Sequence, residues 1–143
     1  MTPKIVKSKA DIELCKEVIL AFRPNVKEEN YVELVMEMME KDGFKIAYIP
    51  NEDHTKAVAF TGYRPQLRLL TGKMIYIDDL FTSPECRGKG YAAILLNHVA
   101  EEARKNGFQS IHLDSGYMLH DAHRLYLNQG YILGCNHFIK VLS

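Results

Sequence analysis

Two stretches in the N-terminal part of the chain carry apolar residues at the spacing of an amphipathic helix. The first stretch predicts a helix that ends at the turn containing Pro24. Its apolar stripe consists of Ile12, Cys15, Val18, Ile19 and Phe22. The second stretch predicts a helix over 28–41, which stops at Asp42-Gly43.

Shorter apolar runs bounded by turn residues predict strands. We expect a short opening strand at 4–7 and a hairpin of two strands, 44–50 and 56–63, around the turn at 51–54. A further strand is predicted over 73–82. Because side chains alternate along a strand, this pattern predicts that Asp78 and Asp79 point to opposite faces of the sheet.

The C-terminal half predicts an alternation of strands and helices. An apolar helix face runs before Gly107, and it consists of Ala92, Leu95, Leu96, Val99 and Ala103. A short strand at 110–113 would then pair in parallel with the strand at 73–82 through a right-handed crossover. A helix over 119–128 that ends at Gly130, and two final strands at 131–135 and 137–142, complete an α/β (α+β) fold with about four helices around one mixed sheet.

Composition narrows the class of protein. The chain has 143 residues and is 47% hydrophobic, which suits a single domain over residues 1–143. Its 18 basic and 18 acidic residues balance, so we expect no binding to nucleic acid or to a membrane surface. An odd number of cysteines, with no signal-like apolar segment, favours free thiols and a cytoplasmic location.

One segment has the features of an anion site. The run from Arg87 to Ala92 places two glycines and two cations at the start of a helix, where the helix dipole disfavours cations unless an anion compensates. Its plainest alternative is a helix that simply begins in a glycine-containing turn. The segment also fits the dinucleotide fingerprint G-x-G-x-x-A, with Asp114 about 20 residues later. Against that interpretation, carboxylates interrupt the preceding strand and too few residues follow to build the rest of such a sheet.

Two motifs together carry a family resemblance. The run Asp78-Asp79-Leu80-Phe81-Thr82-Ser83-Pro84-Glu85-Cys86-Arg87-Gly88-Lys89-Gly90-Tyr91-Ala92 resembles the acetyl-CoA-binding motif R-x-x-G-x-A of the GNAT superfamily of N-acetyltransferases. The run Ala122-His123-Arg124-Leu125-Tyr126-Leu127-Asn128-Gln129-Gly130-Tyr131 resembles the second signature of that family. The resemblance covers about half of the chain, and it extends to bacterial small-amine acetyltransferases.

The resemblance implies a twisted, mostly antiparallel sheet that splays at a central parallel pair and admits the pantetheine arm of acetyl-CoA. The backbone would do most of the binding. The implied cofactor-binding residues are Leu80, Phe81, Thr82, Arg87, Gly88, Lys89, Gly90, Tyr91 and Ala92. One departure is Leu119, where many relatives place an asparagine that contacts CoA.

The resemblance also implies roles in catalysis. Tyr126 matches the general acid of the family, and a phenol is protonated at neutral pH. Its alternative role is that of an anchored core aromatic one helical turn from Ala122. Either Asp78 or Asp79 would deprotonate the amine, directly or through water, and Asp78 is slightly preferred because several small-amine relatives carry an acid there.

Other polar residues carry weaker indications. Asp114 and His120 are candidate substrate contacts, although Asp114 could equally cap the next turn. Cys86 lacks an evident thiolate stabiliser, so a covalent intermediate is not expected. The histidines do not form a recognised metal motif, and we expect no metal.

The sequence therefore predicts transfer of acetyl from acetyl-CoA to a small primary amine. A peptide amine is the second choice of acceptor. A non-catalytic acyl-CoA-binding regulatory module is the alternative from another class, and a homodimer is possible because relatives are often dimers.

Overall fold

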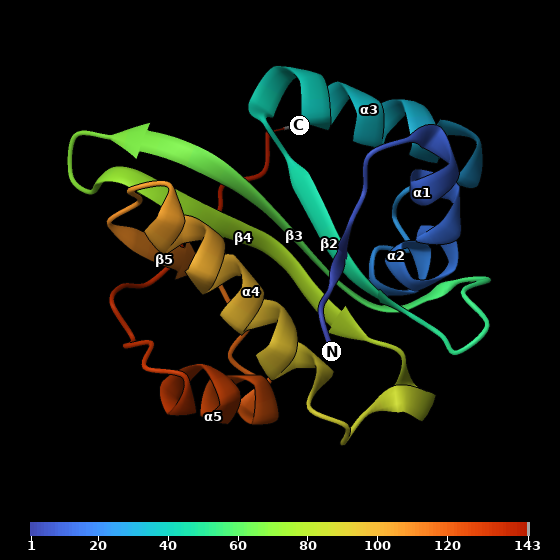
Figure 1. Cartoon of the computed structure of the whole chain (residues 1–143). Coiled ribbons are helices and arrows are strands. Elements are labelled where there is room, and N and C mark those ends of the chain that lie inside the picture. The colour runs from blue at the N-terminus through green and yellow to red at the C-terminus, as the bar shows by residue number, and fades with distance from the viewer. Residues whose placement is uncertain (143) are drawn as a thin grey trace. The chain divides into compact units, whose positions relative to one another are not determined.

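A computed structural model describes residues 1–142 of the protein. The chain divides into two compact units, Met1–Leu113 and a second that begins at Asp114. The first unit contains one sheet of five strands in the order β1-β2-β3-β4-β5 (Figure 1). The strands are β1 (Lys4–Ile5), β2 (Lys45–Pro50), β3 (Ala57–Arg68), β4 (Gly72–Thr82) and β5 (Ser110–Leu113). The first four pair antiparallel and β4 pairs parallel with β5, so the predicted mixed sheet is confirmed.

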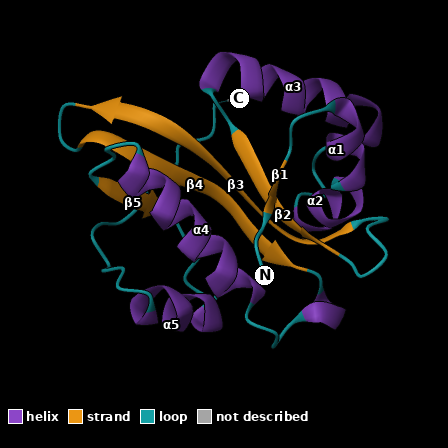
Figure 2. Ribbon diagram, in the orientation of Figure 1, coloured by secondary structure: helices purple, strands orange, loops and turns teal. Residues whose placement is uncertain are grey.

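Helices cover both faces of this sheet, as Figure 2 shows. On one face lie α1 (Lys9–Leu14), α2 (Lys16–Phe22), the 3-10 turn Glu28–Asn30 and α3 (Tyr31–Asp42). On the other lies α4 (Tyr91–Lys105), whose buried residues Leu95, Leu96 and Val99 belong to the predicted stripe. Gly107 (φ +74°) ends α4 in the left-handed conformation, as its position predicted.

The first predicted helix is two helices, which raises the number of α-helices within residues 1–142 to five. The break falls at Cys15, which is fully buried and has φ −88° and ψ −3°. Its N–H is shared between the carbonyls of Asp11 and Ile12, both at 3.2 Å. This tightened turn reorients the chain so that Ile12 before the break and Val18 after it are buried in one cluster.

The second unit contains α5 (His120–Asn128), close to the predicted range. The two strands predicted at 131–135 and 137–142 do not form, so β5 is at the edge of the described sheet and the parallel pair is not central. Apolar side chains of this segment, including Ile132 and Leu133, are exposed. A strand is stable only when its backbone finds a partner, and Gly134 in the middle of the run weakens it further.

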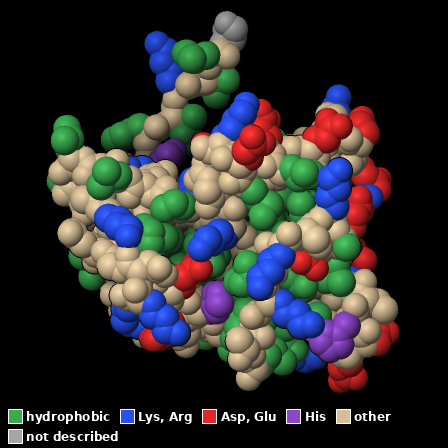
Figure 3. All heavy atoms as spheres, turned by 45° about the horizontal axis from the view of Figure 1, so that its top comes forward, with side chains coloured by type: hydrophobic (Ala, Val, Ile, Leu, Met, Phe, Trp, Pro, Cys, Tyr) green, Lys and Arg blue, Asp and Glu red, His purple; other side chains and the backbone are tan. Residues whose placement is uncertain are grey.

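Acidic and basic side chains are interspersed on the face shown in Figure 3, in keeping with the balanced charge. Hydrophobic side chains lie among them, together with backbone and other side chains. Among residues 1–142, no helix has both the length and the apolar character that crossing a membrane requires.

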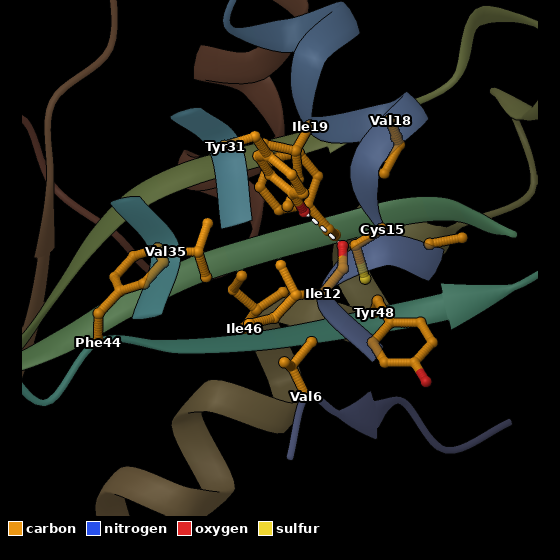
Figure 4. Close-up of a cluster of buried hydrophobic side chains, with 12 residues drawn as sticks. Val6, Ile12, Cys15, Val18, Ile19, Tyr31, Val35, Phe44, Ile46 and Tyr48 are labelled. Carbon is orange, nitrogen blue, oxygen red and sulfur yellow. Dashed lines mark hydrogen bonds between the residues drawn. The ribbon is translucent and has the colours of Figure 1, made fainter. Parts of the chain in front are cut away.

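The main apolar cluster lies between α1–α3 and the sheet (Figure 4). Tyr31, only 1% exposed, starts α3 and donates from its hydroxyl to the Ile12 carbonyl at 2.6 Å. This bond satisfies a buried phenol and ties α3 to α1. Val35 and Phe44 extend the same cluster towards the pocket described below.

Candidate functional site

The loop before α4 contains two glycines in the left-handed backbone conformation. Gly88 has φ +81° and Gly90 has φ +79°, a region that glycine adopts without steric cost. Among residues 1–142, and apart from the glycine itself and its chain neighbours, no heavy atom lies within 4 Å of the position that a Cβ on either glycine would take. A ligand can therefore approach this backbone closely.

The first turn of α4 is suited to an anion. Gly90 caps the helix, and its carbonyl accepts from the N–H of Ile94 at 3.1 Å. The amides of Tyr91, Ala92 and Ala93 consequently have no acceptor within the helix. The turn carries no acidic side chain. These donors and the positive end of the helix dipole fit the phosphates of a nucleotide cofactor.

β4 extends beyond the end of its neighbour β5. Their ladder stops where Ile77 lies opposite Leu113, whereas β4 remains paired with β3 as far as Thr82, opposite Ala59. Among the described strands, residues 80–82 therefore have a sheet neighbour on the β3 side only. Such an edge can bind an extended ligand through main-chain hydrogen bonds.

Asp78 and Asp79 line the same pocket, so the prediction that they point to opposite faces is wrong. Asp79 lies opposite Gly62 and Ile77 lies opposite Tyr63, which leaves Asp78 as an extra residue in a β-bulge. A bulge interrupts the alternation of side chains, and two successive residues can then share a face. The pocket has a volume of about 410 Å³ and lies between α2, α3 and the sheet.

The backbone at the bulge is closely packed. Thr61, which is fully buried, donates from its hydroxyl to the Asp79 carbonyl at 2.8 Å. A Cβ on Gly62 would lie 2.5 Å from Cζ of Phe44 and 2.8 Å from Oδ2 of Asp79. Only glycine leaves room here for both the ring and the carboxylate.

Asp79 forms an ion pair with Arg23, the residue that follows α2. Nε of Arg23 lies 2.7 Å from Oδ1 of Asp79, and Nη2 donates to the Asp78 carbonyl at 2.9 Å. The Asp79 side chain is only 13% exposed. This burial raises the pKa of Asp79 above its ordinary value, although the bonded Arg23 opposes the rise.

Asp78 is held more firmly, by both nitrogens of the Arg64 fork. Nε of Arg64 lies 3.0 Å from Oδ1 of Asp78, and Nη2 lies 2.5 Å from Oδ2. Nη1 of the same guanidinium binds Asp42 at 2.9 Å, at the end of α3. A bidentate bond of this kind fixes the orientation of the carboxylate.

The sequence interpretation missed Arg23, Gly62 and Arg64. A glycine inside a predicted strand is a recognised sign of a bulge or a close approach, so Gly62 could have been found. The two arginines pair with residues 56 and 14 positions away in the sequence, respectively, and no local pattern marks them.

Tyr126 lies in the second unit, on α5. The N–H of Tyr131 donates to the Tyr126 carbonyl at 2.9 Å and that of Gly130 to Leu127 at 3.1 Å, with Gly130 at φ +90°. This is a Schellman motif, and it brings the ring of Tyr131 to a centroid distance of 5.9 Å from that of Tyr126. Burial raises the pKa of the Tyr126 phenol, which is therefore protonated at neutral pH.

The two weaker candidates also lie in the second unit. Asp114 is in contact with His137, with 3.4 Å between Oδ1 and Nδ1. His120 begins α5, and its ring lies 6.3 Å from that of His123. The residue that caps α5 is Leu119.

Comparison with known proteins gives one consistent family. Residues 12–131 match the sequence model of the Acetyltransferase (GNAT) family. The chain is 31% identical over 101 residues to an uncharacterized N-acetyltransferase of Bacillus subtilis, YhdJ, covering 71% of this chain and 70% of that protein. It is 36% identical over 66 residues to the aminoalkylphosphonate N-acetyltransferase of Salmonella typhimurium, but that match spans only 43% of the relative.

A solved structure has the same fold. The acetyltransferase of Trypanosoma brucei superimposes with a TM-score of 0.81 over 98% of this chain and 99% of that one, at 16% identity. The chain therefore belongs to the GNAT family of acetyltransferases, enzymes that use acetyl-CoA as the acyl donor.

Proposed function

We propose that this chain transfers the acetyl group of acetyl-CoA to a primary amine by direct attack within a ternary complex. The observation that carries the proposal is the pair of carboxylates that the β4 bulge turns into one pocket, on the strand that leads to the glycine loop before α4. We treat residues 1–143 as one transferase domain, because the family match runs from residue 12 to residue 131 and so covers parts of both units.

The donor site comprises the loop and the strand edge. The amides from Arg87 to Ala92 would hold the pyrophosphate, and the backbone of residues 80–82 would bond the pantetheine arm. Three observations support this assignment. Gly88 and Gly90 adopt the left-handed conformation, and the first turn of α4 has no acidic side chain. Residues 80–82 of β4 extend beyond the end of the ladder with β5.

We assign the general base to Asp79. Both oxygens of Asp78 are held by Arg64, whereas Asp79 makes its ion pair with Arg23 through one oxygen. A raised pKa also makes Asp79 a better proton acceptor than an ordinary aspartate. Asp78 then acts as a fixed negative charge that favours an ammonium ion nearby.

Tyr126 is the proposed general acid. Its half-buried phenol carries a proton at neutral pH, and the thiolate that leaves on acetyl transfer requires one. The Schellman motif and the ring of Tyr131 limit the conformations of this side chain. We propose a small primary amine as acceptor, a class that includes the aminoalkylphosphonate named for the Salmonella relative.

One experiment tests the assignment in two steps. Binding of acetyl-CoA to the purified protein is measured first, and release of free thiol with a panel of amines second. We expect Gly90→Val to abolish binding, because its side chain would strain a left-handed backbone and obstruct the cradle. Tyr126→Phe should keep the affinity for acetyl-CoA and lose at least tenfold in turnover. Normal binding of acetyl-CoA by Gly90→Val would refute the assignment of the donor site. Full activity of Tyr126→Phe would refute the assignment of Tyr126 as the general acid.

A further inference from the structure

The pocket that holds Asp78 and Asp79 has walls that are mostly apolar. Ten of its fourteen lining residues are aliphatic or aromatic, and the four polar ones are Arg23, Asn25, Asp78 and Asp79. Among the elements that line the pocket, α3 contributes the most apolar residues, namely Tyr31, Leu34, Val35 and Met38. Its volume of about 410 Å³ lies in the range of roughly 300–1,000 Å³ that accommodates small-molecule ligands.

The apolar wall begins next to the carboxylate proposed as the base. The ring of Phe44 and Oδ2 of Asp79 both approach the same point beside Gly62, at 2.5 Å and 2.8 Å from the position of a Cβ there. An amine whose nitrogen lies at Asp79 would therefore have its carbon body against Phe44 and α3. Contact with these side chains would remove apolar surface from water.

The charges of the pocket disfavour an anionic acceptor. Arg23 is paired with Asp79, and Arg64, behind Asp78, is paired with Asp78 and Asp42. The lining itself carries two carboxylates and one guanidinium. A phosphonate or carboxylate on the acceptor would have to disrupt these pairs and would face two like charges.

From these observations we infer that the acceptor is a primary monoamine with an aromatic or branched aliphatic body and no anionic group. This inference rests on the proposed function and narrows its acceptor. The amine binds at Asp79, and the specificity comes from the wall formed by α3 and Phe44. A single methylene group in an apolar pocket changes the selectivity of an enzyme by about 10-fold or more.

The test compares kcat/KM for four amines with the intact protein and acetyl-CoA. The amines are 2-phenylethylamine, ethylamine, spermidine and 2-aminoethylphosphonate. We expect 2-phenylethylamine to exceed each of the others by at least about tenfold. An equal or higher value for any other amine would overturn the inference while leaving the proposed function intact. Failure to bind acetyl-CoA, or no turnover with any of the four, would instead count against the proposed function.

A pair of variants on α3 locates the effect. Leu34 lines the pocket and is 39% exposed, whereas Met36, 40% exposed on the same helix, does not line it. Leu34→Glu should lower kcat/KM for 2-phenylethylamine by at least about tenfold and leave acetyl-CoA affinity unchanged, and Met36→Glu should change neither. Equal behaviour of the two variants would exclude the α3 wall as the source of specificity. The helical circular dichroism signal checks that each variant is folded, and Leu34→Ala serves as a milder substitution at the same position. Both Leu34 and Met36 are partly exposed, so both positions should tolerate substitution without loss of the fold.

Discussion

Replacing Gly62 by alanine should damage both stability and activity, because the added methyl group has no room. Its carbon would lie 2.5 Å from Cζ and 2.9 Å from Cε1 of Phe44, and 2.8 Å from Oδ2 of Asp79. Carbon atoms pack at about 3.5–4.0 Å, so the Phe44 ring would have to move by about 1 Å. That ring is only 5% exposed and packed in the core, which leaves it little freedom.

The magnitude follows from these contacts. Overpacking of a core costs about 1–3 kcal/mol, and the lower chain entropy of alanine in the unfolded state offsets about 0.4–1 kcal/mol of it. We therefore expect a net loss of about 0.5–2 kcal/mol and a Tm lower by several degrees. A displacement of Asp79 by about 1 Å would reduce kcat/KM by up to about 100-fold.

Thermal unfolding and acetyl transfer to the best amine would be measured on the same preparations. Gly134→Ala is the matched control, because among the described residues nothing lies within 4 Å of its added carbon and its φ is not left-handed. That variant should stay within about 0.5 kcal/mol of the parent. If Gly62→Ala has the Tm and kcat/KM of the parent protein, the close packing at the bulge is not what holds Asp79 in place.

Two further predictions concern the arginines. The acid limb of the pH profile of kcat/KM should lie above the ordinary pKa of an aspartate, because Asp79 must lose its proton to act and burial raises its pKa. Arg23→Gln removes the positive charge that opposes this rise, so the acid limb should move to still higher pH. An acid limb that stays in place or moves to lower pH in this variant would contradict the assignment of Asp79 as the base. Arg64→Met should lower the free energy of unfolding by about 1–3 kcal/mol, because it leaves the half-buried Asp78 unpaired, and adding Asp78→Asn should recover part of the loss in chemical denaturation. An equal loss in the single and the double variant would show that the charge of Asp78 is not responsible.

Local patterns in the sequence predicted the parts of this fold that local physics determines. Gly88 and Gly90 marked the loop because they precede an apolar helix, and Gly107 and Gly130 marked helix ends. In each case the information lies within a few residues, since a helix cap or a left-handed turn depends on its immediate neighbours.

Long-range packing determined the features that the sequence interpretation missed. The bulge at Asp78 arises where β4 pairs with Gly62, sixteen residues earlier in the chain, and regular alternation along β4 gives no sign of it. The prediction of two final strands was wrong for a related reason. A strand forms only when its backbone pairs with another strand, and the segment 131–142 has no such partner among the described residues. The break at Cys15 likewise reflects the burial of two helix halves against one sheet.

The bulge in β4 corresponds to the insertion of one residue into a regular strand. Inserting one residue into a regular strand adds a second acid to the face that carries Tyr76, while Ile77 keeps its place on the opposite face. A single insertion thus changes the chemistry on one side of the sheet without rebuilding the packing on the other. Conversely, deleting Asp78 would restore regular alternation, leave Asp79 as the one carboxylate of the pocket lining, and deprive Arg64 of the carboxylate that it binds with two nitrogens.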